Sequence, residues 1–164
     1  MIVLAKEKET KTNVMRILDQ KKIPYQVHHY AHGEGAVDGA SVAAMLGQNP
    51  AQVFKTLVTR GPGGFFVFVV PVEKELDLKA AARAAGEKSV EMIHVKELTP
   101  VTGYVRGGCS PIGMKKQFPT VLDESCLAFP TIIYSAGRIG SQVETSPADL
   151  IRITGAKTAP ITMA

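Results

Sequence analysis

The sequence has no tryptophan, and only 6% of its 164 residues are aromatic. Proteins that hold single-stranded nucleic acid along an extended surface stack successive bases on aromatic side chains. An extended stacking platform is therefore not expected here. Cysteine is equally scarce: Cys109 and Cys126 stand far apart and form no C-x-x-C pair. This sparse use of cysteine is typical of a protein in the reducing cytoplasm, where we expect it to act.

Long hydrophobic runs are also missing. The longest apolar run, residues 65–72, is far shorter than the roughly 20 residues that a membrane-spanning helix needs. The N-terminal residues become charged at Lys6 and lack both the apolar core and the cleavage site of a secretory signal. We therefore expect no membrane contact.

The composition is that of a globular protein. Hydrophobic residues make up 45% of the chain and charged residues 21%, and 164 residues are enough to bury a sizeable core. We therefore predict a single domain over residues 1–164, of which residues 1–10 are expected to be frayed. The net charge of +4 favours polyanionic partners only weakly, because many proteins that never bind nucleic acid carry a similar excess.

The hydrophobic pattern mixes helices with hairpins. Apolar residues at helical spacing predict a helix that starts at Thr12 and ends before Pro24. Capping residues predict a single turn at Asn49-Pro50 and two further helices, one after Asp77 and one after Ser146. Further helix is expected at residues 42–46, a turn near Pro100, and strands at residues 25–30, 53–58, 65–72, 90–93, 120–122, 131–135 and 138–144. This order predicts an α+β fold with one mixed, curled, barrel-like sheet flanked by helices.

The most distinctive stretch runs from Thr102 to Lys116 and contains four glycines and Pro111. Glycines let backbone N–H groups approach a ligand closely, and proline stiffens the loop. Such a loop suits an anion or a polarised carbonyl, although an ordinary connection between two elements would have the same composition. Gly108 and Gly113 have the spacing of a P-loop, but Met114 follows where that motif needs lysine. A nucleotide triphosphatase is therefore excluded.

Other candidate catalytic groups are weaker. His28, His29 and His32 lie close in sequence, but neighbouring strand residues point to opposite faces and no fourth ligand has a recognisable spacing, so no metal site and no cofactor is predicted. Cys109 has no base that the sequence places beside it, and we expect it to fit a tight turn rather than act as a nucleophile. Ser110 lacks the Gly-x-Ser-x-Gly context of a nucleophilic serine.

Lys55 interrupts an apolar strand. A lysine without a partner is costly to bury, so its ammonium either points into a cavity with a partner or reaches water from an edge position. The sequence leaves both options open.

Taken together, these segments resemble the YbaK-type aminoacyl-tRNA deacylases, which are related to the editing domain of bacterial prolyl-tRNA synthetases. The resemblance covers about residues 11–161. It is carried by Gln-Val-Phe-Lys-Thr-Leu-Val at residues 52–58, Glu-Leu-Asp-Leu-Lys at 75–79, Thr-Gly-Tyr-Val-Arg-Gly-Gly-Cys-Ser-Pro-Ile-Gly at 102–113 and Ser-Ala-Gly-Arg-Ile-Gly at 135–140.

The resemblance implies a free-standing editing enzyme that acts on the 3′ aminoacyl end of mischarged tRNA, above all Cys-tRNA(Pro), with prolyl-tRNA synthetase as a further partner. Lys55 matches the lysine that these proteins need for activity. The substrate-binding positions that the resemblance implies are Tyr30, Asp38, Gly107, Gly108, Cys109, Ser110, Pro111, Ser135 and Gln142. The N–H groups of residues 107–110 would stabilise the ester oxyanion, and the family proposal is that the substrate's own thiol attacks its carbonyl.

Two positions depart from the family pattern. Gln142 stands where some members carry aspartate, and Asp38 stands where they carry phenylalanine. Both differences affect the transfer of the amino-acid preference. A deacylase for another misacylated tRNA, such as Ala-tRNA(Pro), and a non-catalytic tRNA-binding adaptor of a synthetase therefore stay as alternatives.

Overall fold

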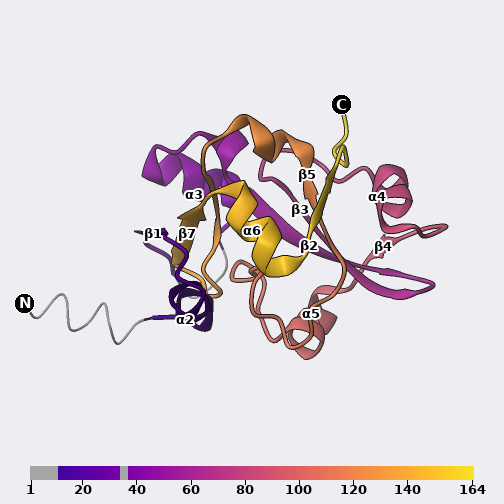
Figure 1. Ribbon diagram of the computed structural model, residues 1–164, viewed down its shortest axis with the longest axis horizontal. Coiled ribbons are helices and arrows are strands. Elements are labelled where there is room, and N and C mark those ends of the chain that lie inside the picture. The colour runs from indigo at the N-terminus through magenta and orange to yellow at the C-terminus, as the bar shows by residue number, and fades with distance from the viewer. Residues whose placement is uncertain (1–10, 34–36) are drawn as a thin grey trace, which may run out of the picture.

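The computed structural model describes residues 11–33 and 37–164 (Figure 1). The expectation that residues 1–10 are frayed lies outside these described residues. Five α-helices are described: α2 (Asn13–Gln20), α3 (Gly39–Leu46), α4 (Leu78–Ala85), α5 (Val95–Thr102) and α6 (Pro147–Thr154). Two short 3₁₀ helices accompany them: η1 (Pro50–Gln52) and η2 (Glu124–Ala128).

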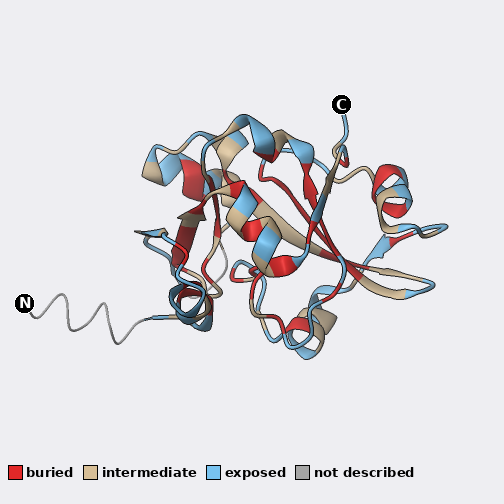
Figure 2. Ribbon diagram, viewed as in Figure 1, coloured by how far each residue is buried: buried red, intermediate tan, exposed pale blue. Residues whose placement is uncertain are grey.

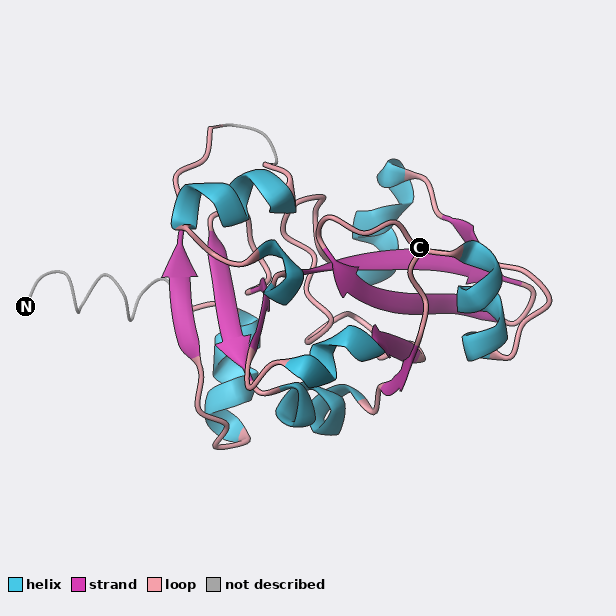
Figure 3. Cartoon of the chain, turned by 90° about the horizontal axis from the view of Figure 1, so that it is seen from above, coloured by secondary structure: helices cyan, strands magenta, loops and turns pink. Residues whose placement is uncertain are grey.

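The described strands form two sheets, which Figure 3 shows side by side. The smaller sheet is antiparallel and has the order β1-β7-β6, from strands β1 (Gln26–His29), β7 (Ser141–Thr145) and β6 (Ile132–Ser135). The larger sheet has the order β4-β2-β3-β5-β8, from strands β4 (Glu91–Met92), β2 (Phe54–Gly61), β3 (Gly64–Pro71), β5 (Thr120–Asp123) and β8 (Lys157–Ala159).

The expected α+β class is confirmed, but the single curled sheet is replaced by two sheets. The larger sheet is mixed, because β2 pairs antiparallel with β3 and β4, whereas β5 pairs parallel with β3 and β8. An isolated parallel bridge from Val53 to Ile133 joins the two sheets at the start of β2. Sequence patterns predict strands but not their pairing, because pairing is set by packing between segments far apart in the chain.

Local capping explains most of the helix boundaries. Asp77 accepts hydrogen bonds from the N–H groups of Lys79 and Ala80 and so begins α4, and Gly86, with a φ of 73°, ends it as expected. The caps that Asn49 and Ser146 were expected to provide are present at η1 and α6.

Two of the expected local structures were wrong. Helix α3 begins earlier than expected, because Asp38 rather than Ser41 is its N-cap. Helix α5 occupies the segment where Pro100 suggested a turn. The carboxylate of Glu97 accepts a hydrogen bond of 2.9 Å from the backbone N–H of His94. This bond stabilises the first turn of the helix and compensates for the backbone hydrogen bond that Pro100 cannot donate.

The main core cluster joins buried residues of both sheets with those of the surrounding helices. Central strand β3 is buried over most of its length, as the red ribbon in Figure 2 shows, while each helix turns an exposed face outward. Fully buried Leu18, Leu122 and Leu150 come from α2, β5 and α6 and belong to the same core cluster. None of the helices in the described part of the chain is long and apolar enough to cross a membrane.

Candidate active site

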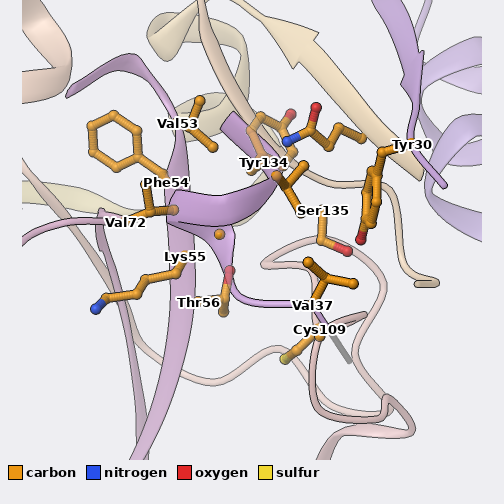
Figure 4. Close-up of a pocket in the computed structure, with 14 residues that line it drawn as sticks. Tyr30, Val37, Val53, Phe54, Lys55, Thr56, Val72, Cys109, Tyr134 and Ser135 are labelled. Carbon is orange, nitrogen blue, oxygen red and sulfur yellow. The ribbon is translucent and has the colours of Figure 1, made fainter. Parts of the chain in front are cut away.

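The inner pocket is a cavity of about 120 Å³ where the start of β2 meets the smaller sheet and the loop of residues 102–116, which we call the glycine loop (Figure 4). Its lining residues come from segments far apart in the sequence: Tyr30, Val37, Gly39, Val42, Val53, Phe54, Lys55, Thr56, Val72, Gly107, Cys109, Tyr134, Ser135 and Gln142. The walls are largely apolar, with a few polar groups among them. That combination is usual for a small-molecule site.

Most of the residues expected in the site meet in this pocket. Six of them line it: Tyr30, Lys55, Gly107, Cys109, Ser135 and Gln142. Four of them do not: Asp38, Gly108, Ser110 and Pro111. Gly108, Ser110 and Pro111 are buried residues within the glycine loop itself. Asp38 lies outside the inner pocket, and both oxygens of its carboxylate are bound to Ser41, at 2.9 Å to the N–H and 2.8 Å to the hydroxyl.

Strand pairing fixes the smaller-sheet side of the pocket. Ser135 of β6 lies opposite Gln142 of β7. Gln142 is only 5% exposed, and its amide oxygen accepts a hydrogen bond of 2.8 Å from Gln48. Tyr30 follows β1 and donates its backbone N–H to Gly140 at 3.0 Å, which brings its ring to the same wall. Gln142 is therefore held as one half of an uncharged amide pair.

The glycine loop follows the geometry that its composition predicted. Gly107 has a φ of 85°, in the left-handed region that glycine adopts at little cost. Gly108 donates its N–H to the carbonyl of Val105 at 2.9 Å, so this donor closes the turn and is not available to a substrate. Of the N–H groups expected to face the substrate, those of Gly107 and Cys109 lie on the pocket and have no acceptor among the described residues.

Cys109 has an unreactive environment despite its place on the pocket wall. Burial raises the pKa of its thiol to about 12 and outweighs the opposing effect of a hydrogen bond with Thr102. A thiol with such a pKa is protonated at neutral pH, whereas catalytic cysteines have a lowered pKa. That Cys109 is not a nucleophile stays a prediction.

Lys55 sits at the mouth of the inner pocket. Figure 4 shows its ammonium pointing away from Tyr30, Ser135 and Cys109, which gather on the other side of β2. Lys55 also lines a second, larger hollow, which we call the outer groove. Of the two options left open by the sequence, this orientation is closer to an edge position with access to water.

The outer groove continues from the inner pocket and shares with it Val37, Gly39, Lys55, Val72 and Gly107. Its further lining residues are Asp38, Ala40, Leu57, Val105, Arg106 and Ile139. The carboxylate of Asp38, which is bound to Ser41, borders this open hollow together with two cationic side chains, those of Lys55 and Arg106. Such a pair suits the phosphates of a nucleic acid.

The clustered histidines have protein partners. His28 is 2.7 Å from the carboxylate of Glu144, and His29 is 3.2 Å from the hydroxyl of Ser141. His32 contacts the carbonyl of Gly33 at 2.8 Å. Among residues 11–33 and 37–164, no group of three or more His, Cys, Asp or Glu side chains is arranged to hold a metal ion.

Sequence reasoning missed the apolar walls and Thr56. Val37, Val42 and Val72 face the pocket because α3 and the end of β3 pack beside β2. Nothing in their local sequence separates them from ordinary core residues. The Thr56 hydroxyl is buried without a hydrogen-bond partner in the described part of the chain. Its position directly after Lys55 was the one available signal.

The fold and site define an aminoacyl-tRNA editing domain. The model of the family described as "Aminoacyl-tRNA editing domain" matches residues 34–153, which is most of the chain. The chain belongs to this family. The assignment of the whole chain, residues 1–164, to one domain stays a prediction.

Among the relatives, a protein of Enterococcus faecalis named "Putative Cys-tRNA(Pro)/Cys-tRNA(Cys) deacylase EbsC" is 48% identical over 97% of this chain and 98% of its own length. A protein of Bacillus subtilis named "Uncharacterized protein YwhH" is 27% identical over 70% of this chain and 73% of its own length. The solved structure of "a putative trans-editing enzyme for prolyl tRNA synthetase" matches with a TM-score of 0.78 and 24% identity, over 92% of this chain and 97% of that one. That similarity supports the fold.

Proposed function

We propose that this protein is a trans-editing deacylase that removes cysteine from Cys-tRNA(Pro). Membership of the editing family and the 48% identity to a protein named for Cys-tRNA deacylation support the proposal. The observation that carries it is the inner pocket, which Gly107 and Cys109 line together with Tyr30 and Ser135, beside a groove bordered by Lys55 and Arg106.

The size of the pocket favours a small amino acid. Its volume of about 120 Å³ is well below the range of roughly 300–1,000 Å³ that drug-sized ligands occupy. Side chains from Val42, Val53 and Val72 close it on the apolar side. A cysteinyl or alanyl group fits this space better than a large aromatic one.

The Gly107–Cys109 loop would stabilise the reaction's charge. Cleavage of an aminoacyl ester builds negative charge on the carbonyl oxygen, and the N–H groups of Gly107 and Cys109, which line the inner pocket, would donate to it. Removing one such donor typically costs on the order of 2.7–4 kcal/mol of transition-state stabilisation. The buried N–H of Gly108 takes no part, because it is bonded to Val105.

The nucleophile in this proposal is the thiol of the substrate. The pKa of about 12 keeps the Cys109 thiol protonated, so it supplies no thiolate. The substrate sulfur loses its proton to water and forms a bond to its own carbonyl carbon. The ester C–O bond then breaks, the ribose oxygen takes up a proton, and a four-membered thiolactone leaves, which water opens to cysteine. Whether the enzyme is classed as a lyase or a hydrolase depends on this step.

Lys55 would bind the nucleic-acid part of the substrate. Its side chain lines the outer groove, and its ammonium points away from Tyr30, Ser135 and Cys109, so it could contact the ribose or the phosphate of the terminal nucleotide. An ammonium is a compact charge that binds phosphate without needing a fixed fork geometry. Lys55 would therefore place the ester beside the loop rather than attack it.

A panel of charged tRNAs tests the proposal. Purified protein should release cysteine from Cys-tRNA(Pro) and leave Pro-tRNA(Pro) intact. Serine differs from cysteine chiefly in its missing thiol, so Ser-tRNA(Pro) should react at least tenfold more slowly. Equal rates for cysteine and serine would contradict thiol-assisted cleavage and support attack by water. Preference for Ala-tRNA(Pro) would support the alternative specificity, and binding without turnover would support an adaptor.

Two further parts of the proposal concern the setting of the reaction. Charged tRNA is made and used in the cytoplasm, which is where we propose that the protein acts. We also propose that prolyl-tRNA synthetase presents the mischarged tRNA. Adding that synthetase to the deacylation assay should lower the KM for Cys-tRNA(Pro), whereas an unrelated synthetase should leave it unchanged.

A further inference from the structure

A second cleft lies next to the inner pocket, between strand β2 and helix α5. This β2–α5 cleft has a volume of about 380 Å³. Its lining residues are Thr56, Leu57, Val58, Met92, Ile93, His94, Val95, Leu98, Arg106, Gly107 and Cys109. It is therefore roomy enough for a heterocyclic base and is bounded by both the sheet and the glycine loop.

The wall formed by β4 and α5 presents accessible apolar side chains. Met92 is 46% exposed and Val95 is 61% exposed, and both line the cleft beside half-buried Leu98. Polar groups come from His94 and Arg106 at the same cleft. An apolar wall with polar groups at its border suits a flat, uncharged ring that carries hydrogen-bonding edges.

This wall is held in place by the sheet. The Arg60 side chain of β2 forms an ion pair with Glu97 of α5, and its guanidinium lies 5.3 Å from the centre of the Phe65 ring. Glu97 also closes the first turn of the helix through the N–H of His94. The cleft is thus built into the fold, because α5 is fixed to β2 and β3 by these contacts.

The cleft joins the two hollows already described. It shares Thr56, Gly107 and Cys109 with the inner pocket, and Leu57, Arg106 and Gly107 with the outer groove. Gly107 therefore borders all three hollows. In an aminoacyl-tRNA, the ester is bonded directly to the ribose of the terminal adenosine, so a carbonyl at Gly107 brings the base and the phosphate within reach of the other two hollows.

Charge separates the two remaining hollows. Arg106 lines both hollows, but Lys55 lines only the outer groove, which is therefore the better place for phosphate, whereas the apolar wall of Met92 and Val95 is the better place for a base. At the boundary between the cleft and the inner pocket, the buried Thr56 hydroxyl has no partner in the described part of the chain. A ribose hydroxyl would satisfy it.

From these contacts we infer that the β2–α5 cleft binds the adenine base of the 3′-terminal nucleotide of tRNA, with Met92, Val95 and Leu98 against the ring and Arg106 toward the phosphate. The inference rests on the proposed function and adds the position of the base. Each of the three hollows at Gly107 then receives one part of the substrate: the aminoacyl group, the base and the phosphate.

Methyl NMR with adenosine 5′-monophosphate (AMP) tests the site without catalysis. In protein labelled at the methionine methyl groups, AMP should shift the Met92 signal in a saturable way. Met45 and Met163 are 52% and 51% exposed and provide matched controls whose signals should not move. Met92→Leu assigns the signal. An unmoved Met92 signal at saturating AMP would overturn the inference.

Deacylation kinetics provide the second test. Val95→Glu places a charge against the base, and it should raise the KM for Cys-tRNA(Pro) at least fivefold while changing kcat less than twofold. Leu127→Glu is the matched control, because Leu127 is 64% exposed and lies outside all three hollows. If Val95→Glu fails to fold, Met92→Ala takes its place, because it only removes part of the apolar wall. This variant should also raise the KM for Cys-tRNA(Pro).

The outcomes distinguish the inference from the proposed function. Active wild-type protein with equal KM values for the Val95→Glu and Leu127→Glu variants would overturn the adenine site alone. Wild-type protein that deacylates none of the charged tRNAs would contradict the proposed function, whatever AMP does to Met92. Raised KM values together with a shifted Met92 signal would support both.

Discussion

Gly108 lies against the backbone of Arg138 and Ile139, so closely that a Cβ atom on it would be 2.9 Å from the Ile139 nitrogen and 3.0 Å from the Arg138 Cα. Because these are backbone atoms, they cannot move aside as a flexible side chain could. The contact fixes the glycine loop to the turn between β6 and β7. We expect the Gly108→Ala variant to lose about 1–3 kcal/mol of unfolding free energy, by analogy with overpacked cores.

The same substitution should also lower kcat, because the N–H groups of Gly107 and Cys109 move with the loop. Chemical denaturation and deacylation kinetics on one preparation measure the two effects. Gly33→Ala is the control, because a Cβ at Gly33 would have no atom of the described residues within 4 Å. Unchanged stability in Gly108→Ala would show that the loop can shift without cost.

Lys55 provides the second prediction. Lys55→Ala removes a cation from the outer groove, and we expect deacylation to become undetectable while the circular dichroism spectrum and the melting temperature stay close to those of the wild type. Loss of a phosphate contact should also weaken the dependence of tRNA binding on salt, measured as the Kd for uncharged tRNA(Pro). Lys88→Ala is the control, since Lys88 is exposed and lines none of the three hollows. Full activity of Lys55→Ala would remove this residue from the mechanism.

Cys109 provides the third prediction. Because burial raises the pKa of its thiol to about 12, Cys109→Ala should keep kcat within about tenfold of the wild type. Loss of a true nucleophile costs on the order of 10⁴-fold or more. The same pKa predicts slow alkylation of Cys109 by iodoacetamide at pH 8, which mass spectrometry can follow. Rapid alkylation together with loss of activity would restore Cys109 as a candidate nucleophile.

Glu144 provides a prediction about pH. Burial acts to raise the pKa of its carboxyl group, but hydrogen bonds from Thr131 and His28 outweigh burial and hold the pKa below the ordinary value of 4.5. As the pH falls, the unfolded chain takes up this proton before the folded chain does. The stability that Glu144 contributes is therefore present above pH 4.5 and is lost as the pH falls through the lower pKa of the folded state.

The Glu144→Gln variant should show the difference. At pH 7 it should lose about 1 kcal/mol of unfolding free energy, because a charge-assisted hydrogen bond is replaced by a neutral one. Below pH 4.5 its stability should approach that of the wild type. Urea denaturation between pH 7 and pH 3 measures both values. Parallel curves over this range would mean that the carboxylate does not contribute in this way.

The parts of the site that sequence reasoning found are those with local signals. Lysine inside an apolar strand is costly in a core, which singled out Lys55, and a dense run of glycines singled out the loop around Gly107. The family resemblance supplied Tyr30, Ser135 and Gln142, and the structure brings all three to the inner pocket. Their roles in catalysis stay predictions.

The other features of the site and fold could not be predicted from the sequence, because they depend on tertiary packing. Nothing near Gly108 in the sequence indicates that its N–H is bonded to Val105, and nothing near Asp38 reveals its bonds to Ser41 except a capping pattern that also fitted Ser41. The β2–α5 cleft needed the position of α5, and Pro100 argued against that helix. The division of the strands into two sheets followed from pairings between segments far apart in the chain.

The pairing of β1 with β7 has a consequence for biosynthesis. The contact between His28 and Glu144 joins residues 116 positions apart, so β1 must wait for most of the chain before it can pair. Contacts of such long sequence separation slow folding. Tyr30, which follows β1, and Gln142, which lies in β7, both line the inner pocket. A nascent chain on the ribosome therefore has no complete site, and the protein becomes able to edit only after its C-terminal third has emerged.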